Sequence, residues 1–302
     1  LFLCYVKNIQ CCLTHVPQKN LCLYADDANL KISASNKDEI ERISLIELSN
    51  INNFLDQHNL RLNVKKTNYL TFKTKQNKNN FEPIITIDNQ LITKIQSTKF
   101  LGLFIDKNLS WDQHVKKLLS KLNSGIYALT KMSFVCSINI LRMVYFSYIH
   151  SHIAYGLCIY GATSKLNLDD ILKIQKKSIR VMLGLKQQTD SAREHFKQLK
   201  IMTVYGQYIH DTIMCVRQKH SIGDPGTMVN HPYNTRNKSE ISVPQHRLNF
   251  FTKKPTYIGS KFLKAIPLVI KQEPNIHVFQ RNLQEYLINR PLYSFDELFE
   301  DH

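Results

Sequence analysis

The feature that most constrains this chain is a change of hydrophobic periodicity near Ser110. Between residues 21 and 105, several short segments alternate apolar and polar residues, a pattern typical of half-buried strands. After Ser110, apolar residues recur every three to four positions, which is typical of amphipathic helices. The sequence therefore predicts an α+β region over residues 1–109 and a helical region from residue 110 onward.

In the first region, two short strands, Leu21–Ala25 and Ala28–Ile32, are expected to flank a tight turn at Asp26–Asp27. A helix is expected over Lys37–Leu55, because its apolar residues share one face. The further expected strands are Leu60–Val64 (continued at Leu70 and Phe72), Ile84–Ile87, Leu91–Thr93 and Lys99–Ile105, with a hairpin turn at Asp88–Asn89.

In the second region, Ser110 and Gln113 have the spacing of a capping box at the start of a helix. Residues 221–234, rich in Gly and Pro, suggest a linker. Three domains are therefore expected, over residues 1–109, 110–220 and 221–302, the last of unknown role. The further expected helices are Ile138–Ile149, Leu168–Leu183, Ala192–Lys219 and Val278–Asn289.

Composition restricts the class of protein. The chain has 40 Lys and Arg residues and 24 Asp and Glu residues, which gives a formal charge of +16. Such a charge favours binding to polyanions, and nucleic acid is the first polyanion to consider. The seven cysteines form no C-x-x-C pair, and no signal peptide is evident, so an intracellular protein of the nucleus or cytoplasm with mostly buried thiols is expected rather than a secreted one. The apolar stretch Val144–Ala162 is interrupted by two histidines and indicates a buried helix with its turn, not a membrane span.

The strongest local signal is Tyr24-Ala25-Asp26-Asp27. Two-metal phosphoryl transfer needs carboxylates that hold ions about 3.5–4 Å apart, and Mg²⁺ prefers such hard oxygen ligands. Two consecutive aspartates on a turn between apolar strands provide ligands of this kind at a fixed position. Taken alone, however, Asp-Asp is also ordinary turn chemistry.

Three motifs in order resemble non-LTR retrotransposon reverse transcriptases. The run Leu21–Leu30 is similar to their catalytic hairpin, and Leu60–Thr67 to the LN..KT segment that follows it. The stretch Phe100–His114 resembles their FLG...D..L.W..H segment, which carries the primer grip and leads into the thumb. The resemblance continues to Lys238, covers nearly the whole chain and looks closest to jockey-like elements of animals.

The resemblance implies a partial palm, a helical thumb and a parent activity of RNA-directed DNA polymerisation with two Mg²⁺ ions. It makes Asp26 and Asp27 catalytic metal ligands and places Lys66 near the incoming triphosphate, although Lys66 also fits a solvated lysine. It places Tyr24 beside the primer end, although a core tyrosine fits as well. The primer grip would be formed by Phe100, Leu101 and Gly102, the two apolar side chains mainly packing.

The chain also departs from the family. Lys7-Asn8 stands where members usually have Asn-Asp, and no Asp or Glu occurs between Leu1 and Ala25. The family's first catalytic aspartate, its nucleotide pocket and its fingers would lie before Leu1. The chain alone is therefore expected not to polymerise.

Two basic surfaces are expected to contact nucleic acid. Residues 57–81 contain six cations and no acid. On a helix turning about 100° per residue, Lys173, Lys176, Lys177 and Arg180 fall within an arc of about 100°. A one-sided row of cations suits a phosphate backbone, although most charged helix faces are simply solvated.

The expected function is thus that of a reverse transcriptase fragment whose partners are an RNA template and DNA primer, or an RNA–DNA hybrid, with no membrane partner. One alternative is a non-catalytic RNA- or DNA-binding protein retained from a mobile element. Another is a gene fragment whose upstream exon restores the enzyme.

Overall fold

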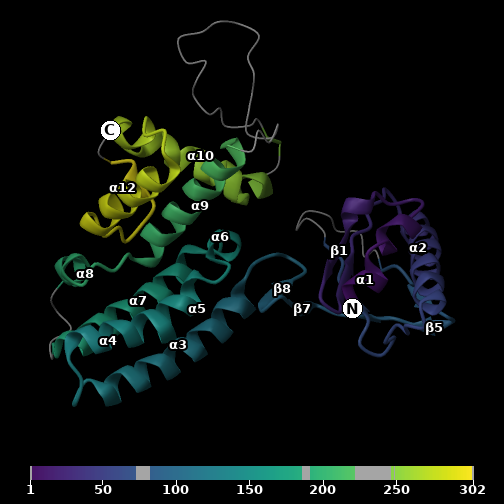
Figure 1. Cartoon of the computed structure of the whole chain (residues 1–302), viewed down its shortest axis with the longest axis horizontal. Coiled ribbons are helices and arrows are strands. Elements are labelled where there is room, and N and C mark those ends of the chain that lie inside the picture. Colours follow the sequence, from purple (N-terminus) through teal and green to yellow (C-terminus); the bar gives the residue numbers. More distant parts are fainter. Residues whose placement is uncertain (1, 73–81, 186–190, 222–245, 248, 301–302) are drawn as a thin grey trace, which may run out of the picture. The chain divides into compact units, whose positions relative to one another are not determined.

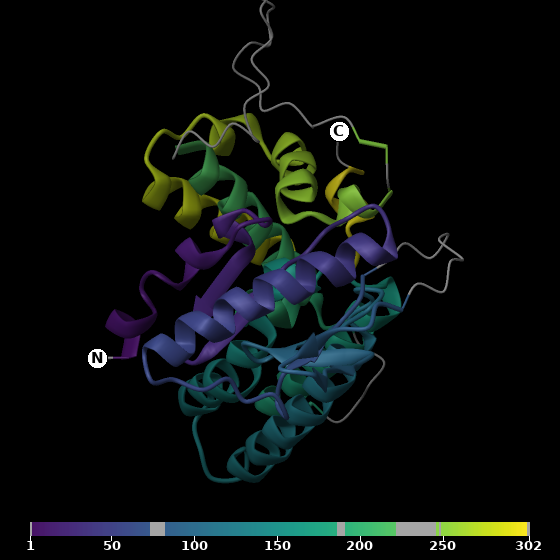
Figure 2. The same cartoon turned by 90° about the vertical axis from the view of Figure 1, so that its right-hand side faces the viewer.

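A computed structural model describes residues 2–72, 82–185, 191–221, 246–247 and 249–300 (Figures 1 and 2). The chain divides into two compact units, residues 1–109 and residues 110–302. The first unit combines one long helix with small two-stranded sheets, and the described part of the second is helical. The protein is therefore a mixed helix and sheet structure, compatible with the expected α+β class.

The first unit contains short helices before a hairpin, one long helix and several two-residue strands. In chain order its elements are α1 (Phe2–Val6), η1 (Ile9–Cys12), η2 (Gln18–Asn20), β1 (Leu21–Tyr24), β2 (Asp27–Leu30), α2 (Lys37–Gln57), β3 (Asn68–Tyr69), β4 (Thr86–Ile87), β5 (Gln90–Leu91), β6 (Thr93–Lys94), β7 (Ser97–Phe100) and β8 (Leu103–Asp106). The expected helix over Lys37–Leu55 is confirmed.

Helix α2 is the scaffold of the first unit. It begins after Asn36, whose side chain accepts a hydrogen bond from the Glu39 amide at 2.9 Å, an N-cap that satisfies a free backbone donor. Asp38 and Glu39 in the first turn interact favourably with the positive end of the helix dipole. From its buried face, Ile51 packs with Val6, Ile9 and Leu21, so the start of the hairpin shares a core with α2.

A buried carboxylate fixes the segment that leads into β1. Glu47 of α2 is fully buried and accepts backbone hydrogen bonds from Thr14, His15 and Val16, with the Val16 amide at 3.0 Å. A carboxylate out of water is tolerated when it is hydrogen-bonded in this way. Glu47 therefore ties the loop before β1 to the long helix and holds the hairpin in place.

The strands of the first unit correct two expectations. The hairpin at Asp88–Asn89 is confirmed: β4 and β5 pair antiparallel, and both turn residues have positive φ, as a tight two-residue turn requires. The expected single strand Lys99–Ile105 is wrong, because the chain reverses at Leu101-Gly102 between β7 and β8. The expected strand Leu60–Val64 is also wrong, since it forms no pairing and ends in a turn at Asn63. Its apolar residues are nevertheless half-buried.

The second unit is an assembly of helices. In chain order its elements are α3 (Asp112–Met132), α4 (Ile138–Tyr145), the π-helical turn η3 (Phe146–His150), α5 (Ser151–Ala154), α6 (Leu157–Tyr160), α7 (Lys165–Leu183), α8 (Arg193–Gln198), α9 (Val204–Ser221), η4 (Asn249–Lys253), α10 (Pro255–Ala265), α11 (Leu268–Lys271), α12 (Ile276–Asn289) and η5 (Asp296–Leu298). Helix α3 packs on α7, and α9 packs on α7, α10 and α12 (Figure 1).

Helix α7 has clear signals at both ends. Its N-cap Ser164 accepts a hydrogen bond from the Asn167 amide at 3.4 Å. Its C-cap Gly184 has φ +66°, and the Leu185 amide bonds to the Arg180 carbonyl at 3.0 Å, a closing motif that favours glycine. The capping box expected for α3 is not formed, because Trp111 occupies the N-cap position and the Ser110 hydroxyl accepts from Asp112 instead.

The apolar stretch of residues 144–162 is broken into α4, η3, α5 and α6, and it is buried on one face only, because Tyr148, Tyr155 and Ile159 are more than half exposed. No helix in the described ranges is long and apolar enough to cross a membrane. The expected helix Ala192–Lys219 is wrong in extent, because α8 and α9 are separated by a buried non-helical segment, Ile201–Thr203. The expected linker falls on residues outside the described ranges, whereas the last expected helix is confirmed as α12.

The expectation of mostly buried thiols is wrong. Among the seven free cysteines, three are exposed and four are half-buried. Five of them lie on helices or 3-10 turns, Cys22 lies on β1, and Cys136 lies in the loop before α4.

Candidate nucleic-acid interface and metal-binding hairpin

The expected tight turn is found one residue earlier than predicted, at Ala25–Asp26, and Asp27 begins β2. Strands β1 and β2 pair antiparallel, with Tyr24 opposite Asp27, so that Ala25 and Asp26 form a two-residue turn. Ala25 has φ +50°, a sparsely populated conformation for a residue other than glycine. Both carboxylates are exposed, and Tyr24 is 61% exposed, which excludes the alternative of a core tyrosine.

The hairpin provides two oxygen ligands, not a complete two-metal site. Asp26 and Asp27 could hold one Mg²⁺ together with substrate phosphates, because this ion often binds through one or two carboxylates. Over the described ranges, no group of three or more His, Cys, Asp or Glu residues could hold a metal ion. Asp106 accepts a hydrogen bond from the Asn108 amide at 2.9 Å within its own turn. The described residues therefore fit part of a two-metal centre.

Lys66 lies in the turn that follows Asn63 and is exposed. Its amide donates to the Asn63 carbonyl at 3.1 Å, so the turn is closed by the backbone. In the part of the chain that the structure describes, no hydrogen bond or ion pair joins Lys66 to either aspartate of the hairpin. Its predicted place near a triphosphate stays a prediction.

The segment Phe100-Leu101-Gly102 forms a hairpin turn rather than a strand. Phe100 ends β7, Leu101 and Gly102 have φ of +45° and +82°, and Leu103 begins β8. Glycine adopts positive φ at little cost, which explains its presence at the second turn position. Phe100 and Leu101 are half-buried, and Gly102 is exposed. A role of this turn in gripping a primer stays a prediction.

The cations predicted on α7 lie together on one open surface pocket of about 520 Å³, named here the α7 groove. Lys173, Lys176, Lys177 and Arg180 form its basic wall. The other lining residues come from the end of α3 and from the end of α7: Thr130, Ser133, Val181, Gly184 and Leu185. The period of the helix therefore gathers four cations around one concave surface, as calculated from their spacing.

The electrostatics of the α7 groove are dominated by positive charge. Burial, and then the nearby charges of Arg180 and Arg193, lower the pKa of Lys176 below that of an ordinary lysine. Lys173 is different, because its ammonium lies 2.7 Å from Asp170, and this hydrogen bond raises its pKa. Crowded cations of this kind are stabilised when an anion enters, because the anion offsets their mutual repulsion.

Tyr293, from the carboxy-terminal segment, supports the wall of the α7 groove. The Lys176 ammonium lies 3.8 Å from the centroid of its ring, and the Arg193 guanidinium lies 4.3 Å from the same centroid. Such cation–π contacts are typically worth about 0.5–2 kcal/mol. Tyr293 therefore holds two positive side chains near each other without neutralising either.

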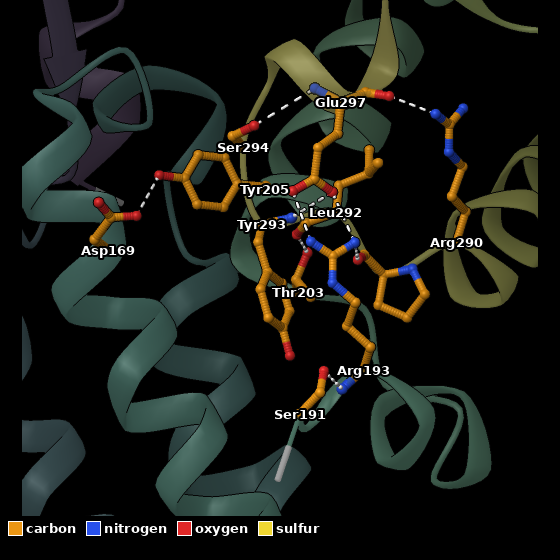
Figure 3. A network of polar contacts seen from close by, with 11 residues as sticks. Asp169, Ser191, Arg193, Thr203, Tyr205, Arg290, Leu292, Tyr293, Ser294 and Glu297 are labelled. Carbon is orange, nitrogen blue, oxygen red and sulfur yellow. Dashed lines mark hydrogen bonds and ion pairs between the residues drawn. The ribbon is translucent and has the colours of Figure 1, made fainter. Parts of the chain in front are cut away.

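A network of polar contacts fixes Tyr293 in turn (Figure 3). Arg193 of α8 forms a two-point ion pair with Glu297, at 2.7 and 2.9 Å, and Glu297 also accepts the Tyr293 amide at 3.3 Å. Burial opposes ionisation of Glu297, but the hydrogen bonds from Arg193 and from the Tyr293 amide lower its pKa below the usual value. The Thr203 hydroxyl donates to the Leu292 carbonyl at 2.7 Å and anchors the same segment to the start of α9.

Sequence reasoning identified the cations of α7 but missed the residues that position them. Tyr293 lies more than one hundred positions after Lys176, and no local pattern connects them. Arg193 lies in a segment that the sequence assigned to a single long helix. The two α3 residues of the groove, Thr130 and Ser133, are small polar positions with no motif of their own.

The basic run over residues 57–81 is only partly described. Arg61, Lys65 and Lys66 are exposed, whereas the three remaining lysines fall on residues outside the described ranges. The structure therefore supports a basic groove on α7 and leaves the second basic surface as a prediction.

Comparison with known proteins finds similarity to polymerases of mobile elements. The chain is 25% identical over 183 residues to the RNA-directed DNA polymerase from mobile element jockey of Drosophila melanogaster, a match that covers 57% of this chain. It is 23% identical over 194 residues to the probable RNA-directed DNA polymerase from transposon X-element of the same organism, covering 63% of this chain. It is 24% identical over 109 residues to the jockey polymerase of Drosophila funebris.

These similarities are partial. The matches cover 19% and 20% of the length of the two Drosophila melanogaster relatives, so the chain spans about a fifth of each. No protein-family model matches the chain, and no solved structure matches it. What the comparisons support is a relation to reverse transcriptases of non-LTR type.

Proposed function

We propose that this chain is the part of a non-LTR retrotransposon reverse transcriptase that holds the RNA–DNA duplex and contributes two of the catalytic carboxylates. The single observation that carries the proposal is the α7 groove, where four cations line one pocket and raise the local positive potential. The similarity to jockey and X-element polymerases supports the choice of nucleic acid as the polyanion. In this proposal residues 1–109 are a partial palm, 110–220 are the thumb, and 221–302 brace it.

On the groove, the phosphate backbone would lie along the cations of α7. Lys177 is exposed and directed by the helix to the same side as Lys173 and Arg180. Contacts of this kind fix the position of a duplex but do not read its sequence. Because each neutralised phosphate releases counterions, the affinity should fall steeply with salt.

On the hairpin, Asp26 and Asp27 would hold Mg²⁺ against the phosphates of the primer end and the nucleotide. When bound, the ions would polarise the phosphoryl group and stabilise the attacking and leaving oxygens. The hairpin holds its two carboxylates in solvent on a backbone that Glu47 and α2 fix in place. Within the described residues no third acidic side chain joins these two, and on this ground we propose that the 302 residues alone do not extend a primer.

The second candidate is a nucleic-acid-binding protein without chemistry. It is favoured by the contrast between an assembled groove and a hairpin that has two carboxylates but no third acidic partner within the described residues. Both candidates share the α7 groove and differ only in what the hairpin does when the missing ligands are supplied.

The groove is tested by fluorescence anisotropy with a labelled 16-base-pair RNA–DNA hybrid between about 50 and 200 mM KCl. The double variant Lys173→Ala/Lys177→Ala should bind at least tenfold more weakly at the lower salt. It should flatten the slope of log Kd against log salt by about 2, one for each lost phosphate contact. Duplexes of different sequence should lose affinity equally.

The matched control is Lys116→Ala/Lys264→Ala, which removes the same charge from exposed lysines of α3 and α10 that do not line the groove. Because salt screens charges beyond about 10 Å at 0.1 M, the control should change Kd less than threefold. Equal losses in both double variants would show a general charge effect and contradict a groove. Binding that ignored salt would contradict phosphate contact altogether.

A further inference from the structure

A second pocket of the same unit has no part in the proposed function. It measures about 200 Å³ and lies among α4, η3, α9 and α12, with one wall from the segment between α8 and α9. We name it the polar pocket. Its lining residues are Arg142, Phe146, His150, Lys200, Met202, Gln207, His210, Gln280, Gln284 and Ile288.

Two buried acceptors in this pocket have no hydrogen-bond partner among the described residues. Gln207 and His210 are each 8% exposed, and the atoms concerned are Gln207 Oε1 and His210 Nε2. The assignment of the amide is chemically fixed, because Gln207 Nε2 donates to Asp211 Oδ1 at 2.7 Å and a flipped amide would set oxygen against carboxylate. Nδ1 of His210 lies 2.9 Å from the same carboxylate, and in the tautomer that donates this hydrogen bond Nε2 is an acceptor without a partner.

Unpartnered buried acceptors are costly and uncommon, so each needs an explanation. Here they point to a ligand that donates hydrogen bonds. The cations of the pocket point to one that is also an anion. Within the described residues, the ammonium of Lys200 forms no ion pair. The Arg142 guanidinium donates its Nε–H to the Leu199 carbonyl at 2.8 Å, and no acidic residue among the described ones pairs with it.

The backbone around the polar pocket is unusual at two points. Residues 146–150 form a π-helical turn that presents both Phe146 and His150 to the pocket, and such turns are frequent at functional sites. Lys200 has φ +51°, a conformation that a non-glycine residue holds only when its surroundings impose it. Two irregularities and two unpartnered acceptors therefore converge on one small space.

From these features we infer that the polar pocket binds a ribose phosphate unit. The phosphate would face Arg142 and Lys200, and sugar hydroxyls would donate to Gln207 Oε1 and His210 Nε2. A volume of about 200 Å³ is below the roughly 300–1,000 Å³ of typical cofactor pockets. The pocket would therefore admit the sugar and phosphate and leave a base at its mouth, beside the exposed amides of Gln280 and Gln284.

The test measures ligand-observed saturation-transfer NMR on the 302-residue chain with ribose 5-phosphate, ribose and inorganic phosphate as probes. Ribose 5-phosphate should bind at least tenfold more tightly than either half. Uridine 5′-monophosphate and a short oligouridylate strand then distinguish a free nucleotide from the end of an RNA strand as the source of the unit.

Two variants separate the contacts. Lys200→Asn removes the cation while keeping a residue that tolerates positive φ. It should weaken the binding of ribose 5-phosphate about tenfold without changing the binding of ribose. Gln207→Met removes the acceptor at similar size and should weaken ribose and ribose 5-phosphate but not phosphate. If Gln207→Met lowers Tm by more than about 10 °C, Gln284→Met on the exposed face of α12 is tested instead. This variant should weaken the binding of uridine 5′-monophosphate, whose base would lie beside Gln284, and leave the binding of ribose 5-phosphate unchanged.

The control Lys177→Ala, in the α7 groove, should leave every small probe unaffected, so a failure of the proposed function would not be mistaken for a failure of this pocket. Absence of binding at 10 mM ribose 5-phosphate would overturn the proposal and leave a buried water as the partner of the two acceptors. Binding of phosphate as tight as ribose 5-phosphate would also overturn it, because the sugar would then contribute nothing.

Discussion

The two candidate regions differ in how their charged groups are held. On the β1–β2 hairpin, the carboxylates of Asp26 and Asp27 are exposed, and the buried Glu47 fixes the backbone that leads into the hairpin. Along α7, in contrast, the cations are positioned through side chains: Lys176 packs on Tyr293, which is held by Arg193 and Glu297. In the proposed function, the surface that binds the duplex is therefore complete within one unit, whereas metal binding at the hairpin needs ligands that the hairpin does not itself supply.

The first prediction concerns the core beneath the groove. Leu129 of α3 is fully buried next to the groove residue Thr130, so Leu129→Ala should lower the free energy of unfolding by about 2–5 kcal/mol. The emission of Trp111, the single tryptophan and a buried residue of this unit, follows the transition in urea. A loss below about 1 kcal/mol would mean that the groove does not rest on a packed core.

The second prediction concerns the brace of the groove. Glu297→Gln removes the charge that pairs with Arg193, and it should destabilise this unit by about 1.5–3 kcal/mol, the usual range for hydrogen bonds to a charged group. The same substitution should also weaken binding of the RNA–DNA hybrid to the α7 groove, because Tyr293, which contacts Lys176, is then held less firmly. The control Glu194→Gln affects an exposed pair with Lys197 and should cost less than about 0.5 kcal/mol. Equal effects would remove the distinction between a brace and a surface ion pair.

The third prediction concerns pH. Burial lowers the pKa of His114 and of His150 in the folded unit, so below pH 6.5 the unfolded chain binds more protons than the folded one. The stability of the second unit should therefore fall as pH drops from about 6.5 to 5, by at most about 1.4 kcal/mol per pH unit for each histidine. His114→Phe should flatten the dependence, while His152→Asn, at an exposed site, should not. A pH-independent Tm over this range would contradict the argument.

The smallest effect is expected at the hairpin. Asp26→Asn and Asp27→Asn should each change the free energy of unfolding by no more than about 0.5 kcal/mol, because both side chains are exposed and neither forms an ion pair within the described residues. Calorimetry of the whole chain measures this change in the free energy of unfolding. A loss above about 1.5 kcal/mol would show that these carboxylates are structural, and the contrast with the α7 groove would disappear.

What the sequence could predict depends on how local the cause is. The groove cations follow from the 3.6-residue period of one helix, and the Asp88–Asn89 turn follows from short-range turn chemistry. The first hairpin was also expected, but its turn lies one residue earlier than predicted, at Ala25–Asp26. The segment Lys99–Ile105 was misassigned because its apolar residues continue across the turn, and a leucine at φ +45° carries no turn signal.

Distant contacts were beyond any local rule. The break between α8 and α9 occurs at residues 201–203, which continue a helical pattern in sequence but are buried as non-helical chain. Its Thr203 bonds to the Leu292 carbonyl, 89 positions later. The contact between Tyr293 and Lys176 also joins residues far apart in the sequence, so no local pattern predicts it. The acceptors of Gln207 and His210 can be recognised as unpartnered only from the structure of the pocket around them.

The most direct test of the account combines binding and extension in one sample. The chain is titrated onto a labelled poly(rA)–oligo(dT) duplex at several salt concentrations, and Mg²⁺ with dTTP is then added to the saturated complex. We expect salt-dependent binding that Lys173→Ala/Lys177→Ala weakens, followed by no incorporation of dTMP above the level of the Asp26→Ala variant. Incorporation that is lost in Asp26→Ala would contradict the claim that the hairpin lacks a partner, and binding unaffected by the groove substitutions would contradict the claim that α7 holds the duplex.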